Sequence, residues 1–211
     1  MAAADARAAR DTPRLWGSLM SLLLGSASPR RAALLAQLGV DFCVLAADID
    51  ETVLPRESPA AYVQRVARAK AEALRHTAHG AVLTADTTVC IDGEILGKPG
   101  DAGSARAMLR LLSDREHEVM TAVCLTLKAG AVAARLVRTS VRFCALDAAL
   151  IDAYLATDEP WDKAGSYAIQ GLGGSFVRCI NGSYSNVVGL PLVETRELLL
   201  EAGIRTSLAA T

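Results

Sequence analysis

The residues best placed for chemistry follow a short apolar run that ends at Gly25, where the sequence reads Ser26-Ala-Ser-Pro-Arg-Arg31. Ser28 is suited to cap a helix, and Pro29 fits the first helical position. The pattern predicts a strand, a tight turn and a helix N-terminus with free N–H groups and two guanidinium groups beside them. Such a site suits an anion, above all a phosphate. It is not a P-loop, because no Gly-Lys-Ser/Thr follows, and taken alone it is equally an ordinary strand-to-helix connection.

Carboxylates form a second group of candidates. Asp48-Ile-Asp-Glu51 places three of them in four residues after an expected strand, where they could hold a hard divalent cation or form a solvated acidic turn. Asp86 lies inside an apolar, strand-like run, and a carboxylate is costly to bury without a partner. A cation, a water to be activated or a paired lysine would explain it. The hairpin turn at Asp92-Gly93 can fold Lys98 back toward Asp86, so a plain structural ion pair is an alternative.

A glycine-rich segment, 165–174, contains Gln170. Its amide offers both a donor and an acceptor, as recognition of a base requires, although a surface loop is the plain alternative. Phosphate anchors at Ser26, Arg30 and Arg31, carboxylates, and lysines at 70 and 98 complete the inventory for hydrolysis of a phosphoanhydride. Cations spread the negative charge, a divalent metal polarises a phosphoryl oxygen, and a carboxylate orients or deprotonates water.

Helices and strands alternate along the chain and must position these groups. The pattern predicts strands at 20–24, 42–46, 81–91, 94–97, 119–127, 132–144 and 176–180, and helices at 29–38, 59–76, 102–112, 147–157 and 191–202. Two hairpins interleaved with helices indicate an α/β protein with a mixed sheet and flanking helices. The run at 20–24 is too short for a signal-peptide core or a membrane span.

Composition excludes several classes of protein. The chain has 211 residues, 52% of them hydrophobic, and a net charge of -1, so no overall basic field favours nucleic acid. Five widely spaced cysteines without a C-x-x-C pair favour a reducing compartment, and we expect a cytoplasmic protein without a membrane span. Residues 1–17 are expected to be a disordered extension before one two-lobed domain at 18–206. Their Ala/Arg richness leaves organelle targeting open, although Asp5 and Asp11 count against it.

Seven segments, taken in order, resemble the successive motifs of the Maf family. They are Ser26-Ala-Ser-Pro-Arg-Arg31, Asp48-Ile-Asp-Glu51, Ala69-Lys-Ala71, Ala85-Asp-Thr87, Gly97-Lys-Pro99, Lys163-Ala-Gly-Ser-Tyr-Ala-Ile-Gln-Gly171 and Ile180-Asn-Gly-Ser-Tyr-Ser-Asn-Val-Val-Gly-Leu-Pro191. The resemblance implies a nucleoside triphosphate pyrophosphatase that splits the α–β bond with Mg²⁺ or Mn²⁺. It also implies a fold like that of inosine-triphosphate pyrophosphatases, with two lobes around a cleft, and a link to septum formation and cell-division arrest.

The same resemblance assigns roles to individual residues. Asp86 corresponds to the proposed general base, and it would hold the metal with Glu51. The other matching active-site positions are Ser26, Arg30, Lys70 and Lys98. Arg31, Thr87 and Gln170 match three positions that separate the subfamilies.

This combination resembles the dTTP/UTP branch, because the 7-methyl-GTP branch prefers Lys, Trp and Glu at those three positions. The alternatives are hydrolysis of 7-methyl-GTP or a non-catalytic, nucleotide-binding regulator of cell division. The partner is expected to be a nucleoside triphosphate, with no nucleic acid and no membrane. The family often forms dimers, which leaves a homodimer open.

Overall fold

The computed structural model describes residues 22–77, 80–127, 130 and 132–208, and these contain one mixed seven-stranded sheet. The strand order is β2-β1-β3-β5-β6-β7, and β4 pairs with β3 off this path. The strands are β1 (Leu22–Gly25), β2 (Phe42–Val44), β3 (Ala81–Ile91), β4 (Glu94–Leu96), β5 (Glu116–Leu127), β6 (Val132–Phe143) and β7 (Val177–Asn181). The helices are α1 (Pro29–Gln37), α2 (Pro59–Leu74), α3 (Ala102–Leu112), α4 (Ala148–Leu155), α5 (Tyr184–Val188) and α6 (Leu192–Glu201), with short 3-10 helices η1 (Ala164–Ser166) and η2 (Leu172–Phe176).

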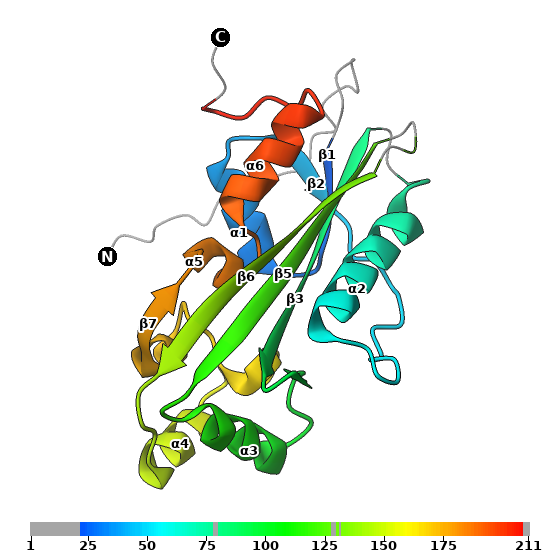
Figure 1. Cartoon of the computed structure of the whole chain (residues 1–211). Coiled ribbons are helices and arrows are strands. Elements are labelled where there is room, and N and C mark those ends of the chain that lie inside the picture. Colours follow the sequence, from blue (N-terminus) through cyan, green and yellow to red (C-terminus); the bar gives the residue numbers. More distant parts are fainter. Residues whose placement is uncertain (1–21, 78–79, 128–129, 131, 209–211) are drawn as a thin grey trace, which may run out of the picture.

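Three long antiparallel strands, β3, β5 and β6, form the middle of the sheet, and helices cover both of its faces (Figure 1). Helix α2 packs small residues such as Ala67 and Ala71 against Met120 and Cys124 on one face. Helices α1 and α6 lie on the other face, where their leucines pack against β1, β3 and β5. Strand β3 is apolar along most of its length because both of its faces are covered. A third cluster, around Phe143, joins α3 and α4 to the far end of the sheet.

The parallel part of the sheet decides where a ligand can bind. Strand β1 lies between β2 and β3 and is parallel to both. The chain leaves β1 through α1 on one face of the sheet and reaches β3 through α2 on the opposite face (Figure 1). The carboxyl end of β1 is therefore a topological switch point, and ligands of α/β proteins bind in the crevice beyond such a point.

The structure confirms the mixed α/β sheet and most of the predicted elements. Strand β3 and helix α3 have the predicted bounds, and Asp101 caps α3 by accepting from the backbone N–H of Ser104 at 2.7 Å. Asp92 and Gly93 form the predicted turn with φ of 53° and 82°, the left-handed geometry that hairpin turns favour. The predicted extension at 1–17 lies outside the described residues. Within the described part of the chain, no helix is long and apolar enough to span a membrane.

Two predicted elements differ from the structure, and one helix of the structure was not predicted. Strand β5 begins at Glu116 rather than at 119, because its first residues pair with the end of β6. The segment 165–174 is not a simple loop but contains the end of η1 and the start of η2. Helix α5 was not predicted: it has five residues, fewer than two helical turns, so its apolar residues show no readable periodicity.

Candidate active site

A cavity of about 620 Å³ lies beyond the carboxyl end of β1, and it brings together the nine residues that the family resemblance assigns to the active site. They come from six separate parts of the chain. The residues are Ser26, Arg30, Arg31, Glu51, Lys70, Asp86, Thr87, Lys98 and Gln170. The cavity reaches both faces of β3 because β1 pairs with β3 only as far as Thr84, which leaves the next residues of β3 uncovered on that edge.

A lysine holds two carboxylates together at the centre of the site. Lys70 Nζ lies 2.7 Å from Glu51 Oε1 and 2.8 Å from Asp86 Oδ1. Lys70 and Asp86 are 8% and 5% exposed, whereas Glu51 is exposed to solvent. Burial raises the pKa of Asp86 above its usual range, and the positive charges of Lys70 and Arg31 oppose this rise. A carboxylate with a raised pKa accepts a proton more readily, as a general base must.

Strand alternation explains why Asp86 pairs with Lys70. Successive side chains of β3 point to opposite faces of the sheet. Thr84 donates to the carbonyl of Ala67 in α2 at 2.7 Å, so Asp86, two residues on, also faces α2 and meets Lys70. Lys98, which the hairpin was expected to fold toward Asp86, lies on the cavity wall just after β4. Among the described residues, the ion pairs of Asp86 include Lys70 and not Lys98.

Thr87 faces the other side of the sheet and belongs to a network around Arg31. Arg31 donates from Nε to the carbonyl of Gly189 at 2.8 Å and from Nη2 to Thr87 Oγ1 at 3.0 Å. Its Nη1 lies 3.3 Å from Ser26 Oγ. Thr87 Oγ1 in turn lies 2.9 Å from Thr121 Oγ1, which donates to the carbonyl of Asn186. Arg31 is thus held in one orientation by Ser26 just after β1, by Thr87 in β3 and by Gly189 at the end of α5.

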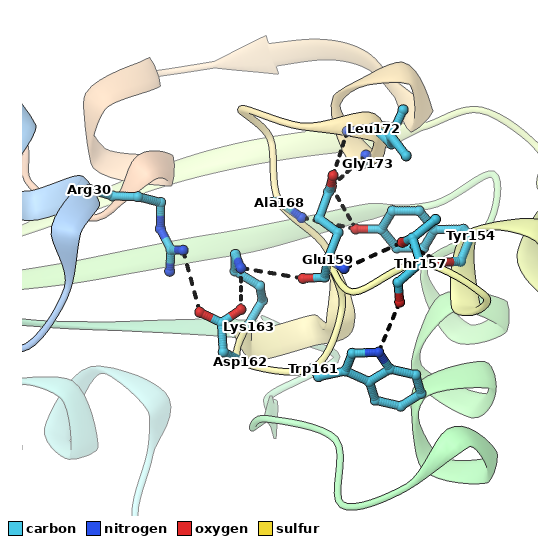
Figure 2. Close-up of polar contacts among 10 residues, drawn as sticks. All are labelled: Arg30, Tyr154, Thr157, Glu159, Trp161, Asp162, Lys163, Ala168, Leu172 and Gly173. Carbon is cyan, nitrogen blue, oxygen red and sulfur yellow. Dashed lines mark hydrogen bonds and ion pairs between the residues drawn. The ribbon is translucent and has the colours of Figure 1, made fainter. Parts of the chain in front are cut away.

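Arg30 has a looser environment than its neighbour. Its Nη1 lies 3.6 Å from Asp162 Oδ2, and the two side chains are 33% and 65% exposed (Figure 2). Ser28 caps α1 in extended conformation without a side-chain hydrogen bond, while Ser26 Oγ accepts from the Ser28 N–H at 3.2 Å. The first turn of a helix offers N–H groups that the helix itself cannot satisfy, so this end of the cavity suits phosphate oxygens.

Of the carboxylates predicted to bind a metal, some line the cavity and others do not. Glu51 and Asp86 are hard oxygen donors that share one ammonium group, and Mg²⁺ commonly uses one or two carboxylates together with substrate phosphates. Their chemistry therefore fits a divalent cation. The expected three-carboxylate cluster at 48–51 is not assembled: Asp50 Oδ1 accepts from the Thr52 N–H at 2.8 Å, and Glu51 alone of the three lines the cavity. No three His, Cys, Asp or Glu residues of the described chain are grouped to hold a metal ion.

Sequence reasoning missed several residues that shape the cavity. Gly189, Thr121 and Asn186 fix Arg31 and Thr87, yet they do so through backbone carbonyls or buried hydroxyls, which leave no pattern in a sequence. Glu159 was also missed, and the signal available for it was the cluster of acidic residues just before the Gln170 segment.

Solved structures that resemble this chain match only part of it. A nucleoside-triphosphatase / dITP/XTP pyrophosphatase from Mycobacterium abscessus aligns with a TM-score of 0.41 and 21% identity over 61% of this chain and 77% of its own. The Ham1 protein of Staphylococcus aureus aligns with a TM-score of 0.44 and 14% identity over 58% of this chain and 71% of its own.

Similarity to curated proteins extends over most of the chain. A protein named dTTP/UTP pyrophosphatase from Shewanella sp. (strain MR-7) is 56% identical over 195 residues, covering 88% of this chain and 100% of that protein. A protein of the same name from Anaeromyxobacter dehalogenans is 56% identical over 185 residues, covering 86% of this chain and 94% of that protein. The model of the family described as Maf-like protein matches residues 21–202, and the chain belongs to the Maf family.

Proposed function

We propose that this protein is a nucleoside triphosphate pyrophosphatase that hydrolyses dTTP and UTP to the nucleoside monophosphate and pyrophosphate. The observation that carries the proposal is the buried Asp86 carboxylate, held by Lys70 in a cavity that also contains two arginines and Gln170. Relatives named dTTP/UTP pyrophosphatase, 52 to 56% identical to this chain, support the choice of substrate.

In this proposal the triphosphate lies at the start of α1. Ser26 and the first-turn N–H groups of α1 would donate to phosphate oxygens, and Arg30 would exchange its contact with Asp162 for a phosphate. Lys98, exposed on the cavity wall, would neutralise a further part of the negative charge. These cations stabilise charge that builds up on the leaving pyrophosphate, which is the main requirement of phosphoryl transfer.

Asp86 would act as the general base. Because Oδ1 accepts from Lys70, we assign the proton transfer to Oδ2. Water loses a proton to this oxygen as its own oxygen forms a bond to the α-phosphorus. The bond from the α-phosphorus to the bridging oxygen breaks, and pyrophosphate leaves with that bond's electron pair. Lys70 keeps the carboxylate in place through its contacts with both Asp86 and Glu51.

A divalent cation, Mg²⁺ or Mn²⁺, is part of the proposal. Glu51 and Asp86 would hold it, and when bound it would polarise a phosphoryl oxygen. Glu51 is the exposed member of the pair, so it can change its contacts when a cation enters, whereas Asp86 is fixed by burial.

Selection of the base would depend on Arg31, Thr87 and Gln170. Thr87 is small and is held by Arg31 and Thr121, which leaves room for a pyrimidine ring. The amide of Gln170 can pair with the carbonyl and N–H edge that thymine and uracil share. The reaction would then remove unwanted nucleotides before their incorporation.

The test measures pyrophosphate release from a panel of nucleoside triphosphates, with and without Mg²⁺. We expect release from dTTP and UTP, dependence on the metal, and much slower reaction with CTP, GTP and 7-methyl-GTP. Preference for 7-methyl-GTP would instead place the protein in the 7-methyl-GTP branch of the family. Tight binding of dTTP without pyrophosphate release would favour the non-catalytic regulator.

A further inference from the structure

Glu159 lies outside the set of residues assigned above, but its carboxylate is the centre of the segment that carries Gln170. It accepts hydrogen bonds from the Leu172 N–H at 2.7 Å, the Gly173 N–H at 2.9 Å and the Tyr154 hydroxyl at 2.9 Å (Figure 2). Partial burial would raise the pKa of Glu159, but the two backbone N–H groups and the Tyr154 hydroxyl together lower it below the usual range. The carboxylate is therefore ionised at neutral pH, and it makes charge-assisted hydrogen bonds.

The backbone from Ala168 to Gly174 is folded closely around this carboxylate. A Cβ added at Gly171 would lie 2.1 Å from Glu159 Oε2, and one added at Gly173 would lie 2.8 Å from the Tyr154 hydroxyl. The Tyr154 hydroxyl also accepts from the Ala168 N–H at 3.3 Å, so Tyr154 links Glu159 to the near end of the segment. Glycines at 171 and 173 are required by this close approach, because the carboxylate is held in place and cannot move aside.

Glu159 is itself anchored to helix α4. Its N–H donates to Thr157 Oγ1 at 3.3 Å, and that hydroxyl donates to the carbonyl of Tyr154 at 2.7 Å (Figure 2). Tyr154 is buried against Phe176, with ring centroids 4.9 Å apart. The core at the far end of the sheet thus fixes the position of the carboxylate. The carboxylate in turn fixes the backbone of the segment 168–173 through its hydrogen bonds.

We propose that Glu159 is a positioning residue for nucleotide selection, holding the 168–173 backbone so that the Gln170 amide meets the base. This inference rests on the proposed function. Gln170 stands between Ala168 and Leu172, both of which are tied to the Glu159–Tyr154 pair. A hydrogen-bonding site discriminates only when its groups are accurately placed, and a displacement of about 1 Å can cost about 10²-fold in rate.

The first experiment compares Glu159→Gln with Asp158→Asn, which removes the charge of an exposed neighbouring carboxylate. In Glu159→Gln one oxygen becomes an NH₂ group, which cannot accept from a backbone N–H, so the segment must shift. We expect the ratio of kcat/KM for dTTP to that for CTP to fall about tenfold, mainly through a higher KM for dTTP. Turnover of CTP should stay within about twofold, because Asp86 and Lys70 are untouched. Asp158→Asn should leave the ratio unchanged.

A double-mutant cycle decides whether Glu159 acts through Gln170. Gln170→Ala removes the amide, and in that background Glu159→Gln should change selectivity no further. If Glu159→Gln does not fold, Tyr154→Phe replaces it. This change removes one donor to Glu159 and the acceptor of the Ala168 N–H, but it leaves the contacts of Glu159 with Leu172 and Gly173. It should lower the same ratio by a smaller factor.

An unchanged ratio in the folded variants, or an equal loss with all nucleotides, would overturn this inference. So would a full effect of Glu159→Gln in the Gln170→Ala background. If the unaltered protein prefers dTTP and UTP while the variants keep that preference, only the role of Glu159 fails. If the unaltered protein releases no pyrophosphate from dTTP or UTP, the proposed function itself fails.

Discussion

Arg30 and Arg31 are neighbours in sequence, but they differ in the number and kind of their contacts. Arg31 makes hydrogen bonds to Gly189, Thr87 and Ser26, from three separate parts of the chain. Arg30 makes an exposed ion pair with Asp162 at 3.6 Å. An exposed pair contributes about 0–1 kcal/mol, so a phosphate can replace Asp162 at little cost. If Arg31 selects the base and Arg30 binds phosphate, as we propose, the selecting side chain is fixed before the ligand arrives, whereas the phosphate-binding side chain can exchange partners.

The largest effect is expected at Asp86, which, like Arg31, is held in place by its contacts. Asp86→Asn removes the proposed base, and we expect turnover to fall about 10²- to 10⁴-fold. Lys70 retains its contact with Glu51, so the fold should survive. Pyrophosphate release measures the loss, and circular dichroism checks the fold. Asp48→Asn, an exposed carboxylate outside the cavity lining, is the matched control. Near-normal dTTP hydrolysis by Asp86→Asn would remove Asp86 from the role of base.

His117 is a buried titratable residue that contacts the cavity wall through Tyr167, and we expect it to make the stability of the protein depend on pH. It is 2% exposed, and its Nε2 lies 2.9 Å from the hydroxyl of Tyr167, a residue of the cavity wall. Burial lowers the pKa of His117 to about 4, from an ordinary value of 6.5. Its Nδ1 is buried without a hydrogen-bond partner among the described residues, so protonation would leave an unsatisfied charged donor.

Between pH 6.5 and about 4 the unfolded chain therefore binds a proton that the folded protein does not. The contribution to stability is complete above pH 6.5 and decreases as the pH falls through this window. The loss amounts to about 3 kcal/mol by pH 4. Urea unfolding at pH 7 and at pH 4.5 should reveal this loss, and His117→Gln should reduce the difference between the two pH values. An equal difference in both proteins would show that other groups produce the acid sensitivity.

Replacement of the two arginines tests the comparison directly. Arg31→Ala leaves the Gly189 carbonyl without its side-chain partner and removes one of the two hydrogen bonds of the Thr87 hydroxyl, so the free energy of unfolding should fall by about 2 kcal/mol. Arg30→Ala removes one exposed ion pair, and stability should change by less than about 0.5 kcal/mol while the KM for dTTP rises. Urea unfolding and steady-state kinetics measure both effects. Equal destabilisation by the two changes would contradict the distinction between a fixed and an exchangeable arginine.

The sequence predicted which residues meet at the cavity better than it predicted their partners. Asp86 stands out because a carboxylate interrupts an apolar run, and that run predicts the strand 81–91 correctly. Its partner is Lys70 rather than Lys98, because the pairing depends on which face of the sheet α2 covers. That fact follows from the tertiary arrangement and not from any local pattern. The contact of Arg31 with Gly189 spans 158 residues and is hidden for the same reason.

Local signals also explain which elements were found. Helix α3 has a capping box at Asp101 and an amphipathic face, and both are visible in the sequence. The segment around Gln170 was predicted to recognise a base, but the reason for its glycines was not. Gly171 lies against the Glu159 carboxylate and Gly173 against the Tyr154 hydroxyl, and these close approaches appear only once the chain is folded.

The smallest effect is expected at Asp162, and it tests whether Arg30 can exchange Asp162 for a phosphate. Asp162→Asn frees Arg30 and Lys163 from a competing carboxylate. Stability should change by less than about 0.5 kcal/mol, because the Asp162 side chain is 65% exposed. The KM for dTTP should fall about two- to threefold, with kcat unchanged, because the triphosphate no longer displaces an anion from Arg30. Added salt should narrow the gap between the two proteins, since it screens the same ion pair. A higher KM would mean that Asp162 assists substrate binding, and the looser arginine would then be positioned rather than free to exchange.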